Sequence, residues 1–363
     1  MFFKNAIADI RGFLRREKIY SFLLILILFT YAFLLAFAGR IHERESEAMT
    51  KIKHAEKSLR QNQSEQQALE NFLREHPRRT MALSGFFALL TLALGIGAIL
   101  DFGVVAGYFR KKPFIRSIRS PEPVAWGGSD IAKVVILFFT AGLASNFFLA
   151  ILKASVFKGW SENFLLLLHT TFVDLFILLL IVYFGVKRYG GRLKDLGISF
   201  ATWGKDCLVG LMGYLATLPL FFIVLFVLLV LAALFSYEPP PHPLVEVFVQ
   251  EDKKNPLLIG YSIFLACVIG PIVEEFFFRG FAYPALKKRW GIWPAMIFTS
   301  AVFAWTHNSS FAFWPIFVLG MVLTYLYERR GSLLSSIAMH VTHNTLFILI
   351  FFLMKRTLLD YFL

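Results

Sequence analysis

The sequence predicts an all-α protein, a polytopic membrane bundle of about nine transmembrane helices. Of its 363 residues, 57% are hydrophobic and 17% are charged, and the mean hydropathy is +0.64. A soluble domain of this length could not bury so much apolar surface. Apolar runs recur along the chain, and most reach the roughly 20 residues that a helix needs to cross a hydrocarbon core. Backbone groups find no water there, so the spans should be helices.

Nine apolar runs are candidate spans. They cover residues 19–39, 81–108, 131–154, 163–186, 206–236, 257–278, 291–306, 312–328 and 332–354. Most of the 37 lysines and arginines fall in segments on the same side of the membrane as the N-terminus. We therefore expect an integral protein of the bacterial inner (cytoplasmic) membrane, with its N-terminus cytoplasmic and its C-terminus outside.

The net charge of +13 has the same explanation. Because the basic residues gather at alternate span ends, they indicate topology and contact with membrane lipids, and we expect no nucleic acid partner. The two cysteines, Cys207 and Cys267, lie in apolar runs, and their spacing is not typical of a metal site or a disulfide framework. The sequence leaves the oligomeric state open.

The first apolar run has two interpretations. A basic stretch precedes it and Ala36-Phe37-Ala38 resembles a cleavage site, as in a signal peptide. Its apolar part extends from about Ile19 to Ala38, which is longer than the usual signal core. We interpret the run as an uncleaved anchor, and the orientation of the remaining spans is the same in both cases.

Two regions divide the chain. Residues 1–130 form a membrane hairpin with a polar loop at about 40–80 and a basic linker, and residues 131–363 form the core bundle. The loop is rich in Glu, Lys and Gln, so we expect it to be largely helical. A solvated spacer and a partner-binding or substrate-gating segment are both compatible with it.

The first chemical motif is Glu274-Glu275 followed by Arg279, at the end of the sixth run. On a helix, Glu275 and Arg279 are four residues apart and can pair, which lowers the cost of both charges. Glu274 is turned by about 100° from Glu275, so it points elsewhere. A glutamate that faces a low-dielectric pocket without a cation is suited to act as a general base near neutral pH.

Two further motifs follow in the next runs. Phe303 and His307 share one helix face, and an imidazole at the end of a span can bind a metal or hold and activate water. His340 and Asn344 also share a face, and both could donate hydrogen bonds to one oxygen, as an oxyanion needs. His343 lies off that face, and we assign it no role.

Charged and histidine side chains within spans are rare and usually functional, because each charge costs roughly 2.5–3.5 kcal/mol at a helix centre. The motif region, 257–350, holds three such motifs. Other intramembrane polar residues occur singly, and we interpret them as interhelical hydrogen-bonding groups. These are Asp101, Asn146, His169 and Asp174.

The pattern EExxxR, then FxxxH, then HxxxN resembles the CPBP family, the CAAX-processing and bacteriocin-processing intramembrane proteases of the Abi type. The segment DLGISF at 195–200 also looks like a short family segment upstream of the core. The resemblance implies a peptide-bond hydrolase in a helical bundle. In it, Glu274 and His307 would activate water, His340 and Asn344 would form the oxyanion site, and Glu275, Arg279 and Phe303 would support them.

The three motifs are compatible with a reaction that uses a metal and with one that does not. Glu274, His307 and His340 could ligate Zn²⁺ with a fourth position for water, or they could act without a metal. For Glu274 and His307 to meet, the sixth helix must continue to about Lys287, and the seventh must be tilted or end deep in the bundle.

We therefore expect an intramembrane endopeptidase that cuts a membrane-associated protein or peptide. Two other classes are weighed against it. One is a non-proteolytic scaffold, regulator or immunity protein on the same bundle, and the other is an ion-coupled transporter that uses the buried charges as a relay. A transporter is expected to show repeat symmetry, which the sequence does not display.

Overall fold

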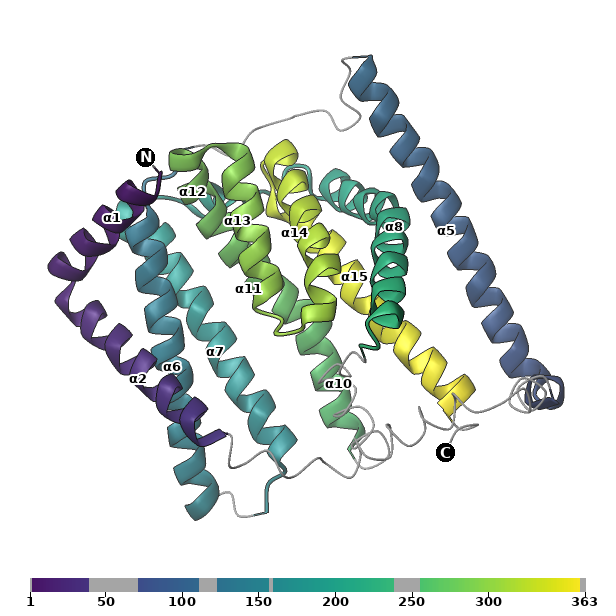
Figure 1. Ribbon diagram of the computed structural model, residues 1–363, viewed down its shortest axis with the longest axis horizontal. Helices are drawn as coiled ribbons and strands as arrows, with labels where there is room; N and C mark the ends of the chain where they lie inside the picture. Colours follow the sequence, from purple (N-terminus) through teal and green to yellow (C-terminus); the bar gives the residue numbers. More distant parts are fainter. Residues whose placement is uncertain (1, 39–70, 111–122, 157–158, 238–254, 360–363) are drawn as a thin grey trace. The chain divides into compact units, whose positions relative to one another are not determined.

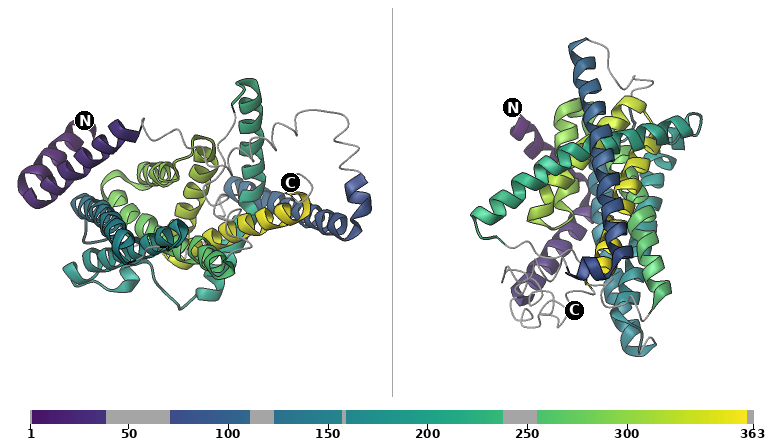
Figure 2. Two further views of the ribbon diagram at one scale, coloured as in Figure 1. Left: turned by 90° about the horizontal axis from the view of Figure 1, so that it is seen from below. Right: turned by 90° about the vertical axis from the view of Figure 1, so that its right-hand side faces the viewer.

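The structure is a computed structural model that describes residues 2–38, 71–110, 123–156, 159–237 and 255–359. Over these ranges every regular element is a helix, and no strand is formed (Figures 1 and 2). The predicted all-α class is confirmed. The predicted loop at 40–80 and the basic linker lie mostly outside the described residues.

Twelve α-helices have both of their ends within the described residues, and shorter helical turns join some of them. They are α1 (Phe2–Arg16), α2 (Lys18–Ala38), α5 (Pro77–Phe109), α6 (Gly128–Ser155), α7 (Glu162–Gly185), α8 (Trp203–Leu234), α10 (Pro256–Phe264), α11 (Gly270–Glu275), α12 (Tyr283–Trp290), α13 (Ile292–Trp305), α14 (Ser310–Arg330) and α15 (Leu333–Met354).

Seven helical segments of the described chain are long and apolar enough to cross a membrane, which makes this an integral membrane protein. They cover 77–107, 128–155, 162–189, 203–234, 256–290, 310–330 and 333–357. The other two predicted spans are also helices, but α13 and the apolar part of α2 are shorter. The count of nine spans therefore stays a prediction.

The sixth predicted span is one long helix that continues to Trp290, past the Lys287 that the sequence required. It is assembled from α10, α11 and α12 with two π-helical turns between them, η3 (Leu265–Ile269) and η4 (Phe276–Ala282). π-helical turns inside α-helices are rare and frequently mark functional sites. Here they lie directly before and after the segment that carries Glu274 and Glu275.

The seventh predicted span, α13, has 14 residues, so its length is about 21 Å. That is less than the roughly 30 Å of a hydrocarbon core. A helix of this length that starts at one membrane surface ends inside the core, and His307 lies two residues beyond its end. Of the two predicted possibilities, a tilted seventh helix and one that ends deep in the bundle, this length favours the second.

Local signals explain where α14 begins and ends. The Ser309 hydroxyl accepts a hydrogen bond of 3.2 Å from the amide of Ala312 and so caps the first turn. Gly331, with φ at 61°, adopts the left-handed conformation that ends the helix. The Ser332 hydroxyl then accepts from the Leu334 amide and starts α15.

The described helices belong to two compact units. The first comprises residues 1–44, 122–198 and 272–295, and the second comprises 45–121, 199–271 and 296–363. In the first unit, α6 packs against α2 and α7, and α7 packs against η4. In the second unit, α8 packs against α5, α14 and α15.

Close helix packing in the second unit depends on two glycines that face backbone. A Cβ on Gly97 of α5 would lie 2.2 Å from the carbonyl oxygen of Leu215, and a Cβ on Gly210 of α8 would lie 2.4 Å from that of Ser335. Small residues let helix backbones approach closely, which favours association in a membrane. A buried hydrogen bond of 2.8 Å from Arg330 to Asp206 also joins α14 to the first turn of α8.

Candidate active site

The pair predicted from the first motif is present in the first unit. Arg279 donates from Nη1 to Glu275 Oε1 at 2.6 Å, and the two side chains are 1% and 0% exposed. The pairing of Glu275 with Arg279 is therefore confirmed. Breaking one side of a buried pair costs about 3–5 kcal/mol, because the other charge is left without compensation. The pair fixes the helix turn on which Glu274 lies.

Glu274 is half-buried, whereas Glu275 is fully buried, as expected for neighbours on different helix faces. The spacing predicted that Glu274 points away from Arg279. In the structure, Arg279 interacts electrostatically most strongly with Glu275, and also with Glu274. Asp174 of α7 also interacts with Glu274 through its charge. The sequence predicts only an interhelical hydrogen bond for Asp174, because nothing in the chain order brings α7 to this turn.

His307 is oriented by its own helix end. Its Nδ1 lies 2.8 Å from the carbonyl oxygen of Phe303, four residues earlier. A carbonyl only accepts, so Nδ1 carries the proton, and Nε2 holds the lone pair in the neutral ring. Phe303 is 0% exposed, and its ring lies 5.0 Å from that of His307 and 5.6 Å from that of His340. Phe303 therefore spaces the two histidines.

His343 belongs to the same cluster, although the sequence assigns it no role. It interacts electrostatically with His340 and His307, and its ring packs 5.8 Å from Tyr214 and 5.4 Å from Phe221 of α8. Its position one helical turn after His340 could have indicated that His343 lies near the other histidines. The sequence does not show that α8 covers that face of α15.

Asn344 is held by a bond that η3 makes available. Its Nδ2 donates to the carbonyl oxygen of Ala266 at 2.8 Å. In an α-helix that carbonyl would accept from Gly270, but the Gly270 amide donates to Leu265 instead, as a π turn requires. The next amide along would be that of residue 271, which is a proline and has no N–H. The Asn344 amide takes the vacant position, and its second N–H remains for another acceptor.

A side chain also bonds the second π turn. Trp126, 2% exposed, donates from Nε1 to the Phe281 carbonyl at 2.8 Å, and its ring stacks on Phe281 at 5.6 Å. Leu196, from the DLGISF segment, is fully buried in the first unit, where a Cβ on Gly185 would approach it to 2.9 Å. This segment therefore packs in the same unit as the turn that carries Arg279.

The predicted site residues are thus gathered in two sets. Glu274, Glu275 and Arg279 lie together in the first unit; Phe303, His307, His340 and Asn344 lie together in the second. Across the described ranges, no three His, Cys, Asp or Glu side chains are grouped so as to hold a metal ion.

Comparison with known proteins supports the motif assignment. Residues 256–346 match the family described as Type II CAAX prenyl endopeptidase Rce1-like. The chain is 33% identical over 78 residues to the UPF0177 protein YbdJ of Lactococcus lactis, covering 21% of this chain and 33% of that protein. It is 24% identical over 200 residues to an uncharacterized 24.3 kDa protein of Escherichia coli, covering 53% of this chain and 84% of that protein. No solved structure matches the chain.

The chain therefore spans about a third of the length of the first relative and most of the second. Fold and site together define an integral membrane protein whose motif side chains lie within its helices or, for His307, just beyond a helix end. The match of segment 256–346 supports the CAAX protease family that the three motifs predicted. All seven motif residues fall inside that segment.

Proposed function

We propose that this protein is an intramembrane endopeptidase that hydrolyses a peptide bond of a membrane-associated protein or peptide. The observation that carries the proposal is the state of His307. Its Nδ1–H is donated to the Phe303 carbonyl, so Nε2 can accept a hydrogen bond from water. The family match over 256–346 supports a protease rather than another use of these groups.

Four residues take part directly in the proposed reaction: Glu274, His307, His340 and Asn344. Glu274 takes a proton from a water molecule that His307 Nε2 helps to orient, and the hydroxide attacks the peptide carbonyl. His340 and the second N–H of Asn344 donate to the oxyanion. When the tetrahedral intermediate collapses, the proton held by Glu274 passes to the leaving amine. Glu275 and Arg279 keep Glu274 in place.

Orientation and location are part of the same proposal. We place the N-terminus in the cytoplasm and the protein in a bacterial inner membrane, because the basic residues favour that side and the two relatives come from bacteria. The substrate would then be cut within the membrane, since Glu274 lies near the middle of the 35-residue helix 256–290.

The test compares purified wild type with Glu274→Gln and His307→Ala in bilayer discs. Proteome-derived peptides and small membrane proteins are added, with and without a chelator, and new termini are read by mass spectrometry. New termini should appear with wild type and be lost in both variants. The matched control is Asp101→Asn, a membrane-span carboxylate outside the motifs, which should retain activity. Full activity in a folded Glu274→Gln variant would refute the proposal, and the chelator arm decides whether a metal takes part.

A further inference from the structure

The first helix differs in kind from the spans that follow it. In α1, Ile10 and Leu14 share one face, and Arg11 and Arg15 share another, because each pair is four residues apart. Helix α2 begins at Lys18, after the single residue Glu17. A short helix with separate apolar and basic faces, joined directly to a span, is typical of a helix that lies in the membrane interface.

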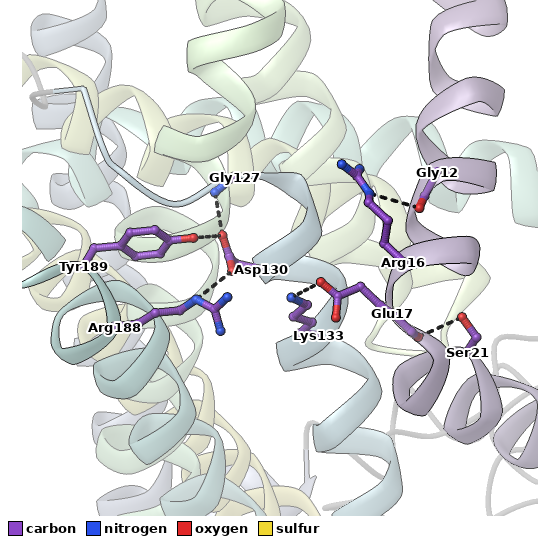
Figure 3. A network of polar contacts seen from close by, with 9 residues as sticks. All are labelled: Gly12, Arg16, Glu17, Ser21, Gly127, Asp130, Lys133, Arg188 and Tyr189. Carbon is purple, nitrogen blue, oxygen red and sulfur yellow. Dashed lines mark hydrogen bonds and ion pairs between the residues drawn. The ribbon is translucent and has the colours of Figure 1, made fainter.

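The bend between α1 and α2 is held by three contacts. The Ser21 hydroxyl donates to the carbonyl of Leu14 across the bend, at 3.0 Å. Lys133 of α6, which is buried, donates to Glu17 Oε1 at 2.5 Å (Figure 3). The Lys133 ammonium also lies 5.4 Å from the centre of the Tyr20 ring. Glu17 and Tyr20 share one partner, Lys133 of α6, so contact with α6 sets the direction in which α1 leaves α2.

The same contacts set the depth of α1. Lys133 lies in the second turn of α6, and Asp130, one turn before it, accepts a hydrogen bond of 2.8 Å from Tyr189 just beyond α7 (Figure 3). The bend therefore lies at the same level as the start of α6 and the end of α7, where the lipid headgroups begin. An ion pair between Asp9 and Arg289 also ties α1 to the basic last turn of α12.

Two apolar side chains of α1 are open in the part of the chain that the structure describes. Ile10 is 58% exposed and Leu14 is 40% exposed. The basic side chains Arg11, Arg15 and Arg16 are exposed as well. One face of α1 thus exposes apolar side chains and another exposes arginines. This arrangement matches the two layers of a leaflet surface, in which acyl chains lie below anionic phosphates.

We propose that α1 lies in the headgroup region and that Arg11, Arg15 and Arg16 form a binding site for anionic phospholipid headgroups. The apolar side chains Ile10 and Leu14 enter the acyl boundary. Because Asp9 is paired with Arg289, the bound lipid is held beside the end of the helix that carries Glu274. This inference does not depend on the proposed peptidase activity.

The first test measures depth. Single cysteines at Ile10, Leu14, Arg11 and Arg15, on a Cys207→Ser and Cys267→Ser background, are spin-labelled in the full-length protein in bilayer discs. Labels at 10 and 14 should be reached by oxygen, which concentrates in the bilayer, and labels at 11 and 15 by a water-soluble relaxation agent. Equal access of the aqueous agent to all four labels would overturn the proposal.

The second test measures lipid preference. Wild type is reconstituted with phosphatidylcholine and phosphatidylglycerol, and the lipids retained on the protein are counted by native mass spectrometry. The triple variant Arg11→Glu, Arg15→Glu, Arg16→Glu should lose at least roughly tenfold of its enrichment in phosphatidylglycerol, since each basic residue near a surface contributes about fivefold.

The matched control is Arg192→Glu, Lys194→Glu, Lys205→Glu, which makes the same charge change at exposed positions outside α1. It should keep most of the enrichment. An equal loss in the control would show that general charge, not α1, selects the lipid. Displacement of the lipid by inorganic phosphate at millimolar concentration would show a site for free phosphate and would also overturn the proposal.

Discussion

Asn344 of α15 donates a hydrogen bond of 2.8 Å to the backbone carbonyl of Ala266. The bond exists because Gly270 donates to Leu265 and Pro271 has no amide to offer. A proline within the motif helix is therefore the reason that a carbonyl is available to Asn344, the proposed oxyanion residue. With one N–H held by this carbonyl, the direction of the second N–H is restricted.

Replacing Pro271 by alanine should impair the proposed reaction without removing any group that touches substrate. The new amide would compete for the Ala266 carbonyl, and Asn344 would lose its anchor. We expect kcat to fall about tenfold or more with little change in KM, since an oxyanion donor acts in the transition state. Steady-state cleavage of a peptide substrate measures both constants.

The partner variants identify the cause. Asn344→Ala should lower kcat as well, and the double variant Pro271→Ala, Asn344→Ala should be no slower than Asn344→Ala alone. Pro219→Ala in α8 serves as the proline control. Additive losses in the double variant would mean that Pro271 acts elsewhere.

The buried Glu275–Arg279 pair should be costly to break from either side. Arg279→Met leaves a carboxylate at 0% exposure without its cation, so we expect a loss of about 3–5 kcal/mol in the free energy of unfolding. Thermal unfolding in detergent measures it. The exposed pair Lys153–Glu162 is the control, and Lys153→Gln should cost less than about 1 kcal/mol. Similar losses in the two variants would contradict the structural role given to the pair.

Gly210 tests the close approach of α8 and α15. In Gly210→Ala, a Cβ would meet the Ser335 carbonyl at 2.4 Å, so the helices must separate. We expect a destabilisation of about 1–3 kcal/mol, the usual cost of overpacking. Gly204→Ala, in the same helix with nothing within 4 Å of its Cβ, should be neutral or stabilising by up to about 1 kcal/mol. A stable Gly210→Ala variant would show that the two helices are not in this contact.

Phe303 should matter to both histidines that it contacts. In Phe303→Leu we expect a smaller stability loss than the roughly 3–5 kcal/mol of a phenylalanine-to-alanine change, and a larger effect on cleavage rate, because the rings of His307 and His340 lose their spacer. Phe298→Leu, on the same helix and 48% exposed, is the control and should change the free energy of unfolding by at most about 0.5 kcal/mol. Equal rates in the two variants would argue against a spacing role.

The helices and the chemical motifs could be predicted from the sequence because their causes are local. An apolar run has few other ways to satisfy its backbone in a bilayer, and residues four apart share a face in any helix. The pairing of Glu275 with Arg279 followed from this spacing. The family match of the 256–346 segment was predicted from the resemblance of its three motifs to those of the family.

Other features were decided only when distant segments packed together. The charge of Asp174 acts on Glu274 because α7 packs near that turn, and His343 joins the histidine cluster because α8 covers it. The Asn344–Ala266 bond links residues 78 positions apart and needs a π turn, which depends on which amide bonds to which carbonyl and not on hydropathy. Periodicity sets which face a residue occupies, whereas only the tertiary structure sets what that face meets.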